Sequence, residues 1–125
     1  MQYPGELKYT QHDEWARIED DVLVLGISDF AQDALGELVH VELPDLGRTV
    51  SAGDAICEVE SVKAVAEVYA PVDGEVVEVN VTLDGQEGTV NRDPYGAGWL
   101  VKIRITNAAQ LSNLLDAASY RSSKG

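Results

Sequence analysis

Lys63 is the residue with the most distinctive chemistry, because its primary amine lies among small apolar side chains. It occurs in the stretch VESVKAVAEVYAP, residues 59–71, directly between Val62 and Ala64. A lysine amine can be a solvated surface charge, a nucleophile with a lowered pKa, or an anchor that is acylated by a cofactor. The position of Lys63 in the fold must discriminate among these three interpretations.

The residues around Lys63 predict a tight hairpin with the lysine at its tip. One strand pattern ends at Glu60 and the next begins near Ala64, which leaves only a few residues to reverse the chain. An exposed tip disfavours the nucleophile, because lowering the pKa of a lysine by several units requires burial. A solvated lysine and a cofactor anchor both remain open, and a protruding turn with small neighbours is what a flexible cofactor arm needs.

Most of the chain consists of short apolar runs that Gly, Pro, Asp or Asn interrupt, a pattern that predicts a mainly β domain. We expect one domain over residues 1–120, which is long enough to bury a hydrophobic core. The predicted strands cover residues 7–10, 14–18, 22–27, 37–43, 55–60, 64–69, 75–81 and 99–105.

Two segments have helical rather than strand periodicity. Residues 28–35 form a short helix in this prediction, with Ser28 as the N-cap and Gly36 after the last turn. Residues 108–118 have apolar side chains at helical spacing, which predicts an amphipathic helix. Residues 121–125, RSSKG, have nothing to bury, so we expect a frayed tail.

Charge and cysteine content exclude several classes of protein. Nine Lys and Arg against 22 Asp and Glu give a net charge of −13, which repels nucleic acids and anionic lipids and favours protein partners with basic patches. The single Cys57 cannot form an internal disulfide, and Cys57, His12 and His40 have no zinc-ligand spacing. No signal-peptide or membrane-spanning pattern occurs. We expect a cytoplasmic monomer without a metal.

Several motifs resemble a known family. The stretch ESVKA with the following YAPVDGEVVEVN resembles the lipoyl hairpin of the lipoyl/biotinyl carrier superfamily, and Val62 and Ala64 stand where a biotin carrier has Met. YTQHDEW, GISDFAQDALGELVHVELPDLG, VNRDPYGAGWL and the leucines near the end resemble the H-protein family of the glycine cleavage system over nearly the whole chain. This resemblance implies a flattened β-barrel or sandwich of two sheets, a lipoyl/biotinyl-type hybrid, with lipoate in amide linkage on Lys63.

The resemblance also implies a carrier without catalytic residues of its own. The lipoyl group on Lys63 takes an aminomethyl group from glycine at a pyridoxal-phosphate glycine decarboxylase (P protein) and presents it to an aminomethyltransferase (T protein). A dihydrolipoyl dehydrogenase (L protein) then reoxidises the dithiol. A lipoyl ligase or transferase attaches the cofactor. Tethering of this kind keeps the reactive group at high effective concentration near each docked partner.

In the same family the loaded arm rests against the protein surface, and the matching positions here include Glu14 and Glu67. Either carboxylate can pair with the cationic aminomethyl nitrogen, or it can be an ordinary solvated acid. The sequence departs from the family pattern at three positions. Asp13 and Phe30 replace His, and Ala66 replaces Ser.

Two further residues and two further functions stay open. Asn91 and Tyr95, in the turn-rich stretch VNRDPYGAGW, either contact a partner or hold their loop. A related H-like carrier can instead relay lipoyl groups to dehydrogenase complexes or carry sulfur in a lipoate-dependent oxidation system. An enzyme is disfavoured, because the sequence has no Ser/His/Asp, metal or phosphate-loop pattern.

Overall fold

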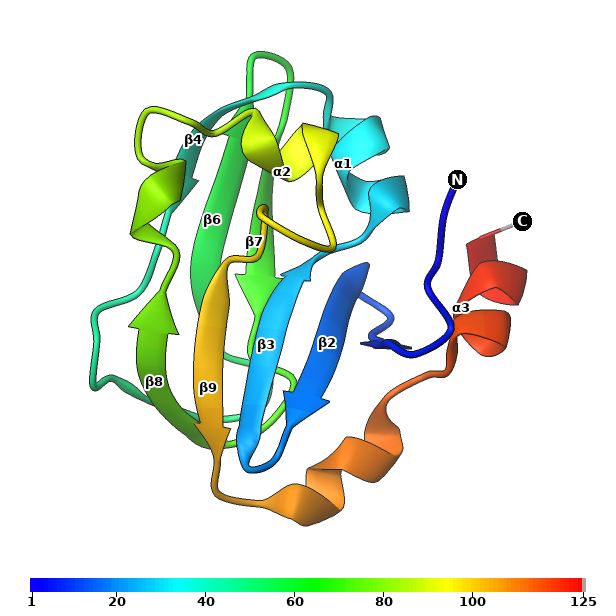
Figure 1. The fold of residues 1–125 in the computed structure, drawn as a ribbon, viewed down its shortest axis with the longest axis vertical. Helices are drawn as coiled ribbons and strands as arrows, with labels where there is room; N and C mark the ends of the chain where they lie inside the picture. The colour runs from blue at the N-terminus through cyan, green and yellow to red at the C-terminus, as the bar shows by residue number, and fades with distance from the viewer. Residues whose placement is uncertain (125) are drawn as a thin grey trace.

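A computed structural model describes residues 1–124 and shows two antiparallel sheets facing each other as an open sandwich (Figure 1). The six-stranded sheet has the order β1-β2-β3-β9-β8-β5, and the three-stranded sheet has the order β4-β6-β7. The strands are β1 Lys8–Tyr9, β2 Glu14–Glu19, β3 Val22–Ile27, β4 Leu38–Glu42, β5 Thr49–Val50, β6 Ala55–Ser61, β7 Val65–Tyr69, β8 Gly74–Val79 and β9 Val101–Ile105. The predicted mainly β fold of two sheets is confirmed.

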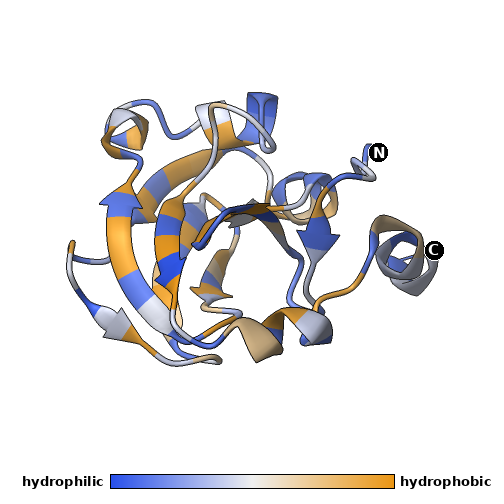
Figure 2. Cartoon of the chain, turned by 60° about the horizontal axis from the view of Figure 1, so that its bottom comes forward, coloured by the Kyte–Doolittle hydropathy of each residue, from blue (hydrophilic) through white to orange (hydrophobic). Residues whose placement is uncertain are grey.

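The main core lies between the two sheets, where alternate side chains of each strand point inward. Apolar and polar segments alternate along the strands in Figure 2, as strands with one buried face require. β3 is an exception, because both of its faces are covered. Leu23 and Leu25 belong to the main core, whereas Val24 packs in a second cluster with Tyr9 and Trp15.

The helix α1, Asp29–Leu35, follows β3 and lies beside the upper end of the sandwich in Figure 1. The predicted caps are both present. The hydroxyl oxygen of Ser28 accepts a hydrogen bond from the Ala31 N–H, and the Gly36 N–H donates to the carbonyl of Gln32. Gly36 has φ of 82°, a left-handed conformation that glycine adopts without steric strain.

The predicted helix over residues 108–118 is wrong in its position. A 3₁₀ helix covers Ala108–Asn113, and the α-helix α3 covers Ala117–Lys124. Between them the N–H and carbonyl of Leu115 pair with the carbonyl and N–H of Tyr9, at 2.7 and 2.8 Å. This backbone pairing interrupts the helix, although the local pattern favours it. Residues 121–124 are therefore part of α3 rather than of a frayed tail, and residue 125 lies outside the described residues.

Smaller differences occur at the ends of strands. β8 ends at Val79, because Val81–Leu83 turns into a 3₁₀ helix, and β9 begins two residues later than predicted, at Val101. The short strand β5 and the four-residue helix α2, Thr89–Arg92, lack a sequence pattern long enough to predict them. Among residues 1–124 no helix is long and apolar enough to cross a membrane.

Gly26 allows a close contact that the second cluster requires. A Cβ atom at Gly26 would lie 2.5 Å from Cε2 of the fully buried Trp15 indole. Gly26→Ala is therefore expected to destabilise the fold by about 1–3 kcal/mol, the usual effect of overpacking a dense core. Urea denaturation measures this difference. Gly5→Ala is the matched control, because a Cβ atom there meets nothing within 4 Å. Equal stability of the two variants would contradict the tight contact.

Candidate functional site

Lys63 lies at the tip of the β6–β7 hairpin, which projects at the top of Figure 1. The Ser61 N–H donates to the Ala64 carbonyl at 2.8 Å and closes the turn. The Ser61 hydroxyl oxygen accepts hydrogen bonds from the N–H groups of Lys63 and Ala64 at 3.3 and 3.2 Å. The predicted hairpin is confirmed, and its tip is exposed, with Val62 90% accessible. The backbone at Lys63 is thus held in place while its side chain remains accessible.

The side chain of Lys63 lies over Gly36, directly after α1. A Cβ atom at Gly36 would be 3.4 Å from Cε of Lys63, an ordinary van der Waals distance, so the end of the lysine side chain lies directly over this glycine. Asn91 holds this surface in place. Its amide nitrogen donates to the Gly36 carbonyl at 2.8 Å, and its amide oxygen accepts from the Leu38 N–H at 2.9 Å.

A cavity of about 190 Å³ lies next to this surface, between α1 and the edge strand β7. Ala31, Ala34 and Leu35 line it from the helix, and Ala66 and Glu67 line it from the strand. Its remaining lining residues are His12, Asp13, Ile27, Val59 and Val68. Leu35 lines the cavity and immediately precedes Gly36 in the chain. The cavity therefore lies next to the residue over which the Lys63 side chain rests.

Glu14 is 1% exposed, which excludes the ordinary solvated acid as an interpretation. Its carboxylate accepts hydrogen bonds from the Thr10 hydroxyl at 2.7 Å and from the Tyr69 N–H at 2.6 Å. Burial raises the pKa of the Glu14 carboxyl to about 7, even though these two hydrogen bonds favour its ionised form. The residue also lines a second cavity, of about 320 Å³, together with Tyr69 and Leu114.

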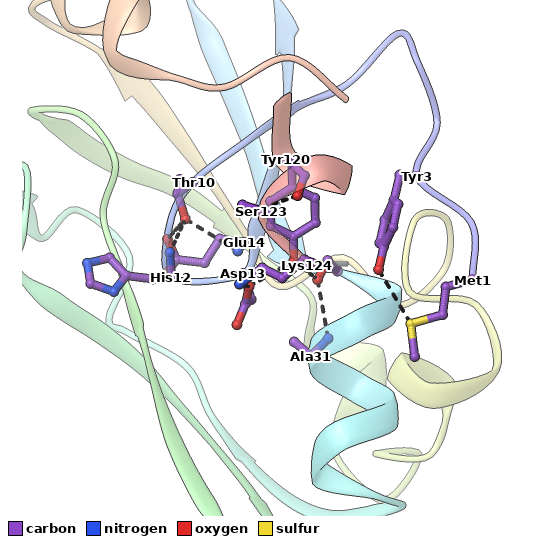
Figure 3. Close-up of polar contacts among 11 residues, drawn as sticks. Met1, Tyr3, Thr10, His12, Asp13, Glu14, Ala31, Tyr120, Ser123 and Lys124 are labelled. Atoms are coloured by element: carbon purple, nitrogen blue, oxygen red, sulfur yellow. Dashed lines mark hydrogen bonds and ion pairs between the residues drawn. The ribbon is translucent and has the colours of Figure 1, made fainter. Parts of the chain in front are cut away.

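Glu67 is exposed and lies on β7 two residues before Tyr69, whose N–H binds Glu14. The two predicted carboxylates therefore lie along the same strand edge, although each lines a different cavity. His12 lines both cavities, and the centre of its ring lies 4.7 Å from the centre of the Tyr69 ring, with the two rings tilted by 45°. The loop of residues 10–14, which contains His12 and Glu14, thus borders both cavities. Figure 3 shows these two side chains with Thr10 and Asp13 of the same loop.

Comparison with known proteins connects this geometry to a family. The family model described as "Glycine cleavage H-protein" matches residues 7–124. The chain belongs to the glycine cleavage H-protein family. Two curated relatives, each named glycine cleavage system H protein, are 54% identical over 121 residues in Alteromonas mediterranea and 50% identical over 118 residues in Alcanivorax borkumensis. The alignments cover 96% and 94% of this chain, and 94% and 92% of the relatives.

The fold agrees with that of a solved family member. The crystal structure of a glycine cleavage system H protein from Mycobacterium marinum matches with a TM-score of 0.91 and 41% identity. The match covers 98% of this chain and 99% of the other. A similarity of this extent shows that the two-sheet sandwich is the fold of the H-protein family, with the β6–β7 hairpin as part of it.

Asn91 and Tyr95 hold the structure together. Besides its contacts at Gly36 and Leu38, Asn91 donates to the side-chain oxygen of Gln32 at 3.1 Å. The Tyr95 hydroxyl donates to the Gln2 carbonyl at 2.7 Å and accepts from the Asp29 N–H at 2.9 Å. These contacts link the 89–98 region to both ends of α1 and give both residues a structural role, and contact of either residue with a partner stays a prediction.

The sequence interpretation missed Thr10 and Tyr69, which bind the Glu14 carboxylate. Thr10 lies four residues before Glu14, and its hydroxyl oxygen also accepts from the N–H groups of His12 and Glu14, at 3.1 and 3.3 Å. A Thr at the start of a tight turn is a local signal for such contacts. Tyr69 contributes only a backbone N–H from a strand 55 residues away, so no sequence signal identifies it.

Lys63 fits an amide-linked cofactor arm. Its amine is accessible, and it takes part in no salt bridge among the described residues. The residues on either side, Val62 and Ala64, are small enough to leave the tip accessible to a modifying enzyme. The Gly36 surface and the adjacent cavity provide a place where an arm that extends from Lys63 can rest.

The Glu14 carboxyl makes stability depend on pH. Its pKa is about 7 in the fold against an ordinary 4.5, so folding is most favourable when it is protonated and loses stability as the pH rises from about 4.5 through 7. Glu14→Gln removes this loss while it can keep the Tyr69 hydrogen bond. The unfolding free energy of the variant relative to wild type is expected to rise by roughly 3 kcal/mol from pH 4 to pH 8.

Chemical denaturation at several pH values measures this difference. Glu67→Gln is the control, because it changes an exposed carboxylate on the same strand edge and is expected to leave the pH dependence of stability as in wild type. A constant difference between Glu14→Gln and wild type from pH 4 to pH 8 would show that the Glu14 carboxyl titrates normally.

Proposed function

We propose that this chain is the lipoyl-bearing carrier of the glycine cleavage system, with Lys63 as the attachment site. The observation that carries the proposal is the position of Lys63 at the tip of a closed turn, with its side chain over Gly36 and next to a cavity. Relatives that are about half identical and are named glycine cleavage H proteins support this pathway over lipoyl relay or sulfur transfer.

The closed turn of the hairpin holds Lys63 at a fixed, exposed position at the tip of the domain. A lipoyl group in amide linkage on Lys63 would supply a cyclic disulfide, which is reduced when it takes up the aminomethyl group left by decarboxylation of glycine: one sulfur would bind the group and the other would become a thiol. The Ser61 hydrogen bonds hold the base of the arm, so the reactive end is confined to the volume that the arm can reach. Confinement of this kind raises the effective concentration of a tethered group at a docked partner.

The two cavities along β7 can shelter a cationic cargo from water. Glu67 lines the nearer cavity, and Glu14 lines the second one along the same strand edge. A positive charge close to Glu14 lowers the pKa of this carboxyl and so favours its ionised form, which binds the cation. Because the pKa of the free carboxyl is about 7, a small pH change alters how strongly the site holds its cargo.

The partners in this proposal are proteins. They are the pyridoxal-phosphate glycine decarboxylase, the aminomethyltransferase, dihydrolipoyl dehydrogenase and the ligase or transferase that attaches lipoate. The carrier itself performs no catalysis and works in the cytoplasm as a monomer. Its charge of −13 favours docking to partners with basic patches, and such contacts form quickly and weaken with salt.

Lys63→Arg is expected to abolish lipoylation while the fold stays intact. Arginine keeps the positive charge but has no amine that can form the amide, and a surface substitution of this kind shifts stability by about 0.5 kcal/mol or less. Incubation with lipoate, ATP and lipoyl ligase, followed by intact-protein mass spectrometry, is the measurement. Wild type and the control Lys8→Arg should each gain one lipoyl adduct, and Lys63→Arg none.

A lipoyl adduct on Lys63→Arg would show that another lysine is the attachment site. Support of glycine–bicarbonate exchange by the unmodified wild-type chain, at the rate of the lipoylated chain, would contradict the carrier function itself. The exchange assay uses unmodified and lipoylated wild-type protein, and the mass measurement establishes which of the two each sample contains.

The paired substitution Glu14→Gln with Glu67→Gln is expected to speed the spontaneous release of the aminomethyl cargo. Each change removes a negative charge beside a cavity while it keeps the size of the side chain. Loss of one charge-assisted contact corresponds to about a tenfold change in rate or more. Formaldehyde and ammonia released from the loaded carrier measure the rate. Glu58→Gln is the control, because Glu58 pairs with Glu67 across the strands but lines neither cavity.

A further inference from the structure

Two residues of α3 meet at one carboxylate beside the arm cavities. Tyr120 and Lys124 lie one turn apart on the same face of the helix. The Tyr120 hydroxyl donates to Oδ1 of Asp13 at 2.9 Å, and Nζ of Lys124 lies 2.6 Å from the same oxygen. Figure 3 shows both side chains reaching from α3 toward the loop of residues 10–14.

The same tyrosine also links α3 to α1. A tyrosine hydroxyl has one hydrogen, and in Tyr120 this hydrogen is donated to the Asp13 carboxylate. The Ser28 hydroxyl, 2.6 Å away, must therefore be the donor in its hydrogen bond with the Tyr120 oxygen. The Ser28 oxygen accepts at the same time from the Ala31 N–H and caps α1. A directed chain of hydrogen bonds therefore runs from the start of α1 through Tyr120 to Asp13.

Lys124 provides a second contact between α3 and α1, in addition to that of Tyr120 with Ser28. Its ammonium lies 4.9 Å from the centre of the Phe30 ring, within the range of a cation–π interaction. Asp13 and Phe30 are two of the three positions at which the sequence departs from the family pattern, and Lys124 contacts both of them. The side chain of Lys124 is only 19% exposed, so these contacts are made in a partly desolvated place where they are stronger than in water.

Asp13 has an unusual backbone conformation at the point where these contacts meet. Its φ is 68°, in the left-handed region that non-glycine residues seldom adopt. The Asp13 carbonyl accepts from the Ser28 N–H at 2.9 Å, which fixes the loop against α1. His12 and Glu14, the neighbours of Asp13, line the two cavities. A relaxed conformation at Asp13 would displace the residues on both sides of it.

We propose that Tyr120 and Lys124 are positioning residues for the arm cavities. They hold Asp13, and through it the loop of residues 10–14, against α1, so that Glu14 stays buried at the Tyr69 N–H and the cavity walls keep their spacing. This inference rests on the proposed carrier function, because it assigns α3 to the sheltering of the cargo. The two residues act through Asp13 and do not touch the arm.

The test uses four variants that separate positioning from general loosening of the helix. Tyr120→Phe removes only the hydroxyl, and Lys124→Met removes only the cation. Arg121→Met removes a neighbouring cation whose guanidinium lies over the Tyr3 ring, and it serves as the matched control. Lys124→Arg restores a cation and is expected to behave as wild type.

The first measurement needs no cofactor. The titration midpoint of the Glu14 carboxyl is followed by carbon NMR in the unlipoylated chain. A loosened loop admits water, so Tyr120→Phe and Lys124→Met should both lower the midpoint toward the ordinary value for glutamate. Removal of a positive charge alone would raise it, so a raised midpoint in Lys124→Met overturns the proposal. An unchanged midpoint in Tyr120→Phe overturns it as well.

The second measurement is the release of the cargo from the lipoylated, loaded carrier. Tyr120→Phe combined with Lys124→Met should release it about tenfold faster, the factor expected for loss of a charge-assisted hydrogen bond. Arg121→Met should match wild type, and equal acceleration by this control overturns the proposal. If Glu14→Gln with Glu67→Gln speeds release and the α3 variants do not, the inference about α3 fails while the proposed function stands.

If Glu14→Gln with Glu67→Gln instead leaves release unchanged, sheltering by the two carboxylates is wrong. The Glu14 midpoint in the unlipoylated chain then decides separately whether α3 fixes the loop. Lys124→Met carries less risk of a folding defect than Tyr120→Phe, because the Lys124 side chain is partly exposed, whereas Tyr120 is fully buried.

Discussion

The hydrogen bond between the Glu14 carboxylate and the Tyr69 N–H connects the two sheets at the side where the candidate site lies. Glu14 begins β2 in the larger sheet, and Tyr69 ends β7, the edge strand of the smaller one. An edge strand has backbone groups without a strand partner, and this carboxylate satisfies one of them. The bond places an acid inside the protein, where burial raises the pKa of Glu14 to about 7. One contact thus serves both packing and the electrostatics of the cavity.

The candidate site separates attachment from shelter. Lys63 lies on a turn that its own hydrogen bonds complete, and its amine is accessible to an enzyme. The nearer cavity lies between α1 and β7, and the second one lies at the Tyr69 end of β7, with the loop of residues 10–14 bordering both. In the proposed function, the exposed anchor presents the arm to partners, and the buried Glu14 at the second cavity gives the loaded arm a place away from water. A carrier that visits several proteins in turn needs both states.

The short helices position these walls rather than contribute large buried surfaces. α1 has seven residues, which is too short to be stable by itself, so it depends on contacts at both ends. Asn91 holds its last turn at Gly36, and Ser28 with Tyr120 holds its first. The polar contacts at both ends keep α1 at a fixed distance from β7, which defines the nearer cavity. Side chains that are distant in sequence therefore determine the shape of the site.

The sequence by itself determined those features that local interactions fix. The hairpin at Lys63, the caps of α1 and the period-2 strands depend on neighbouring residues, and all of them were predicted. The tertiary structure decided the rest. Pairing of Leu115 with Tyr9 interrupts a helix that its own periodicity favours, and the Tyr69 N–H converts Glu14 into a buried acid. The residues in these two pairs are 106 and 55 positions apart, so only folding brings them together. Each bond satisfies a backbone group, and because every residue has such groups, the sequence does not indicate which of them will pair.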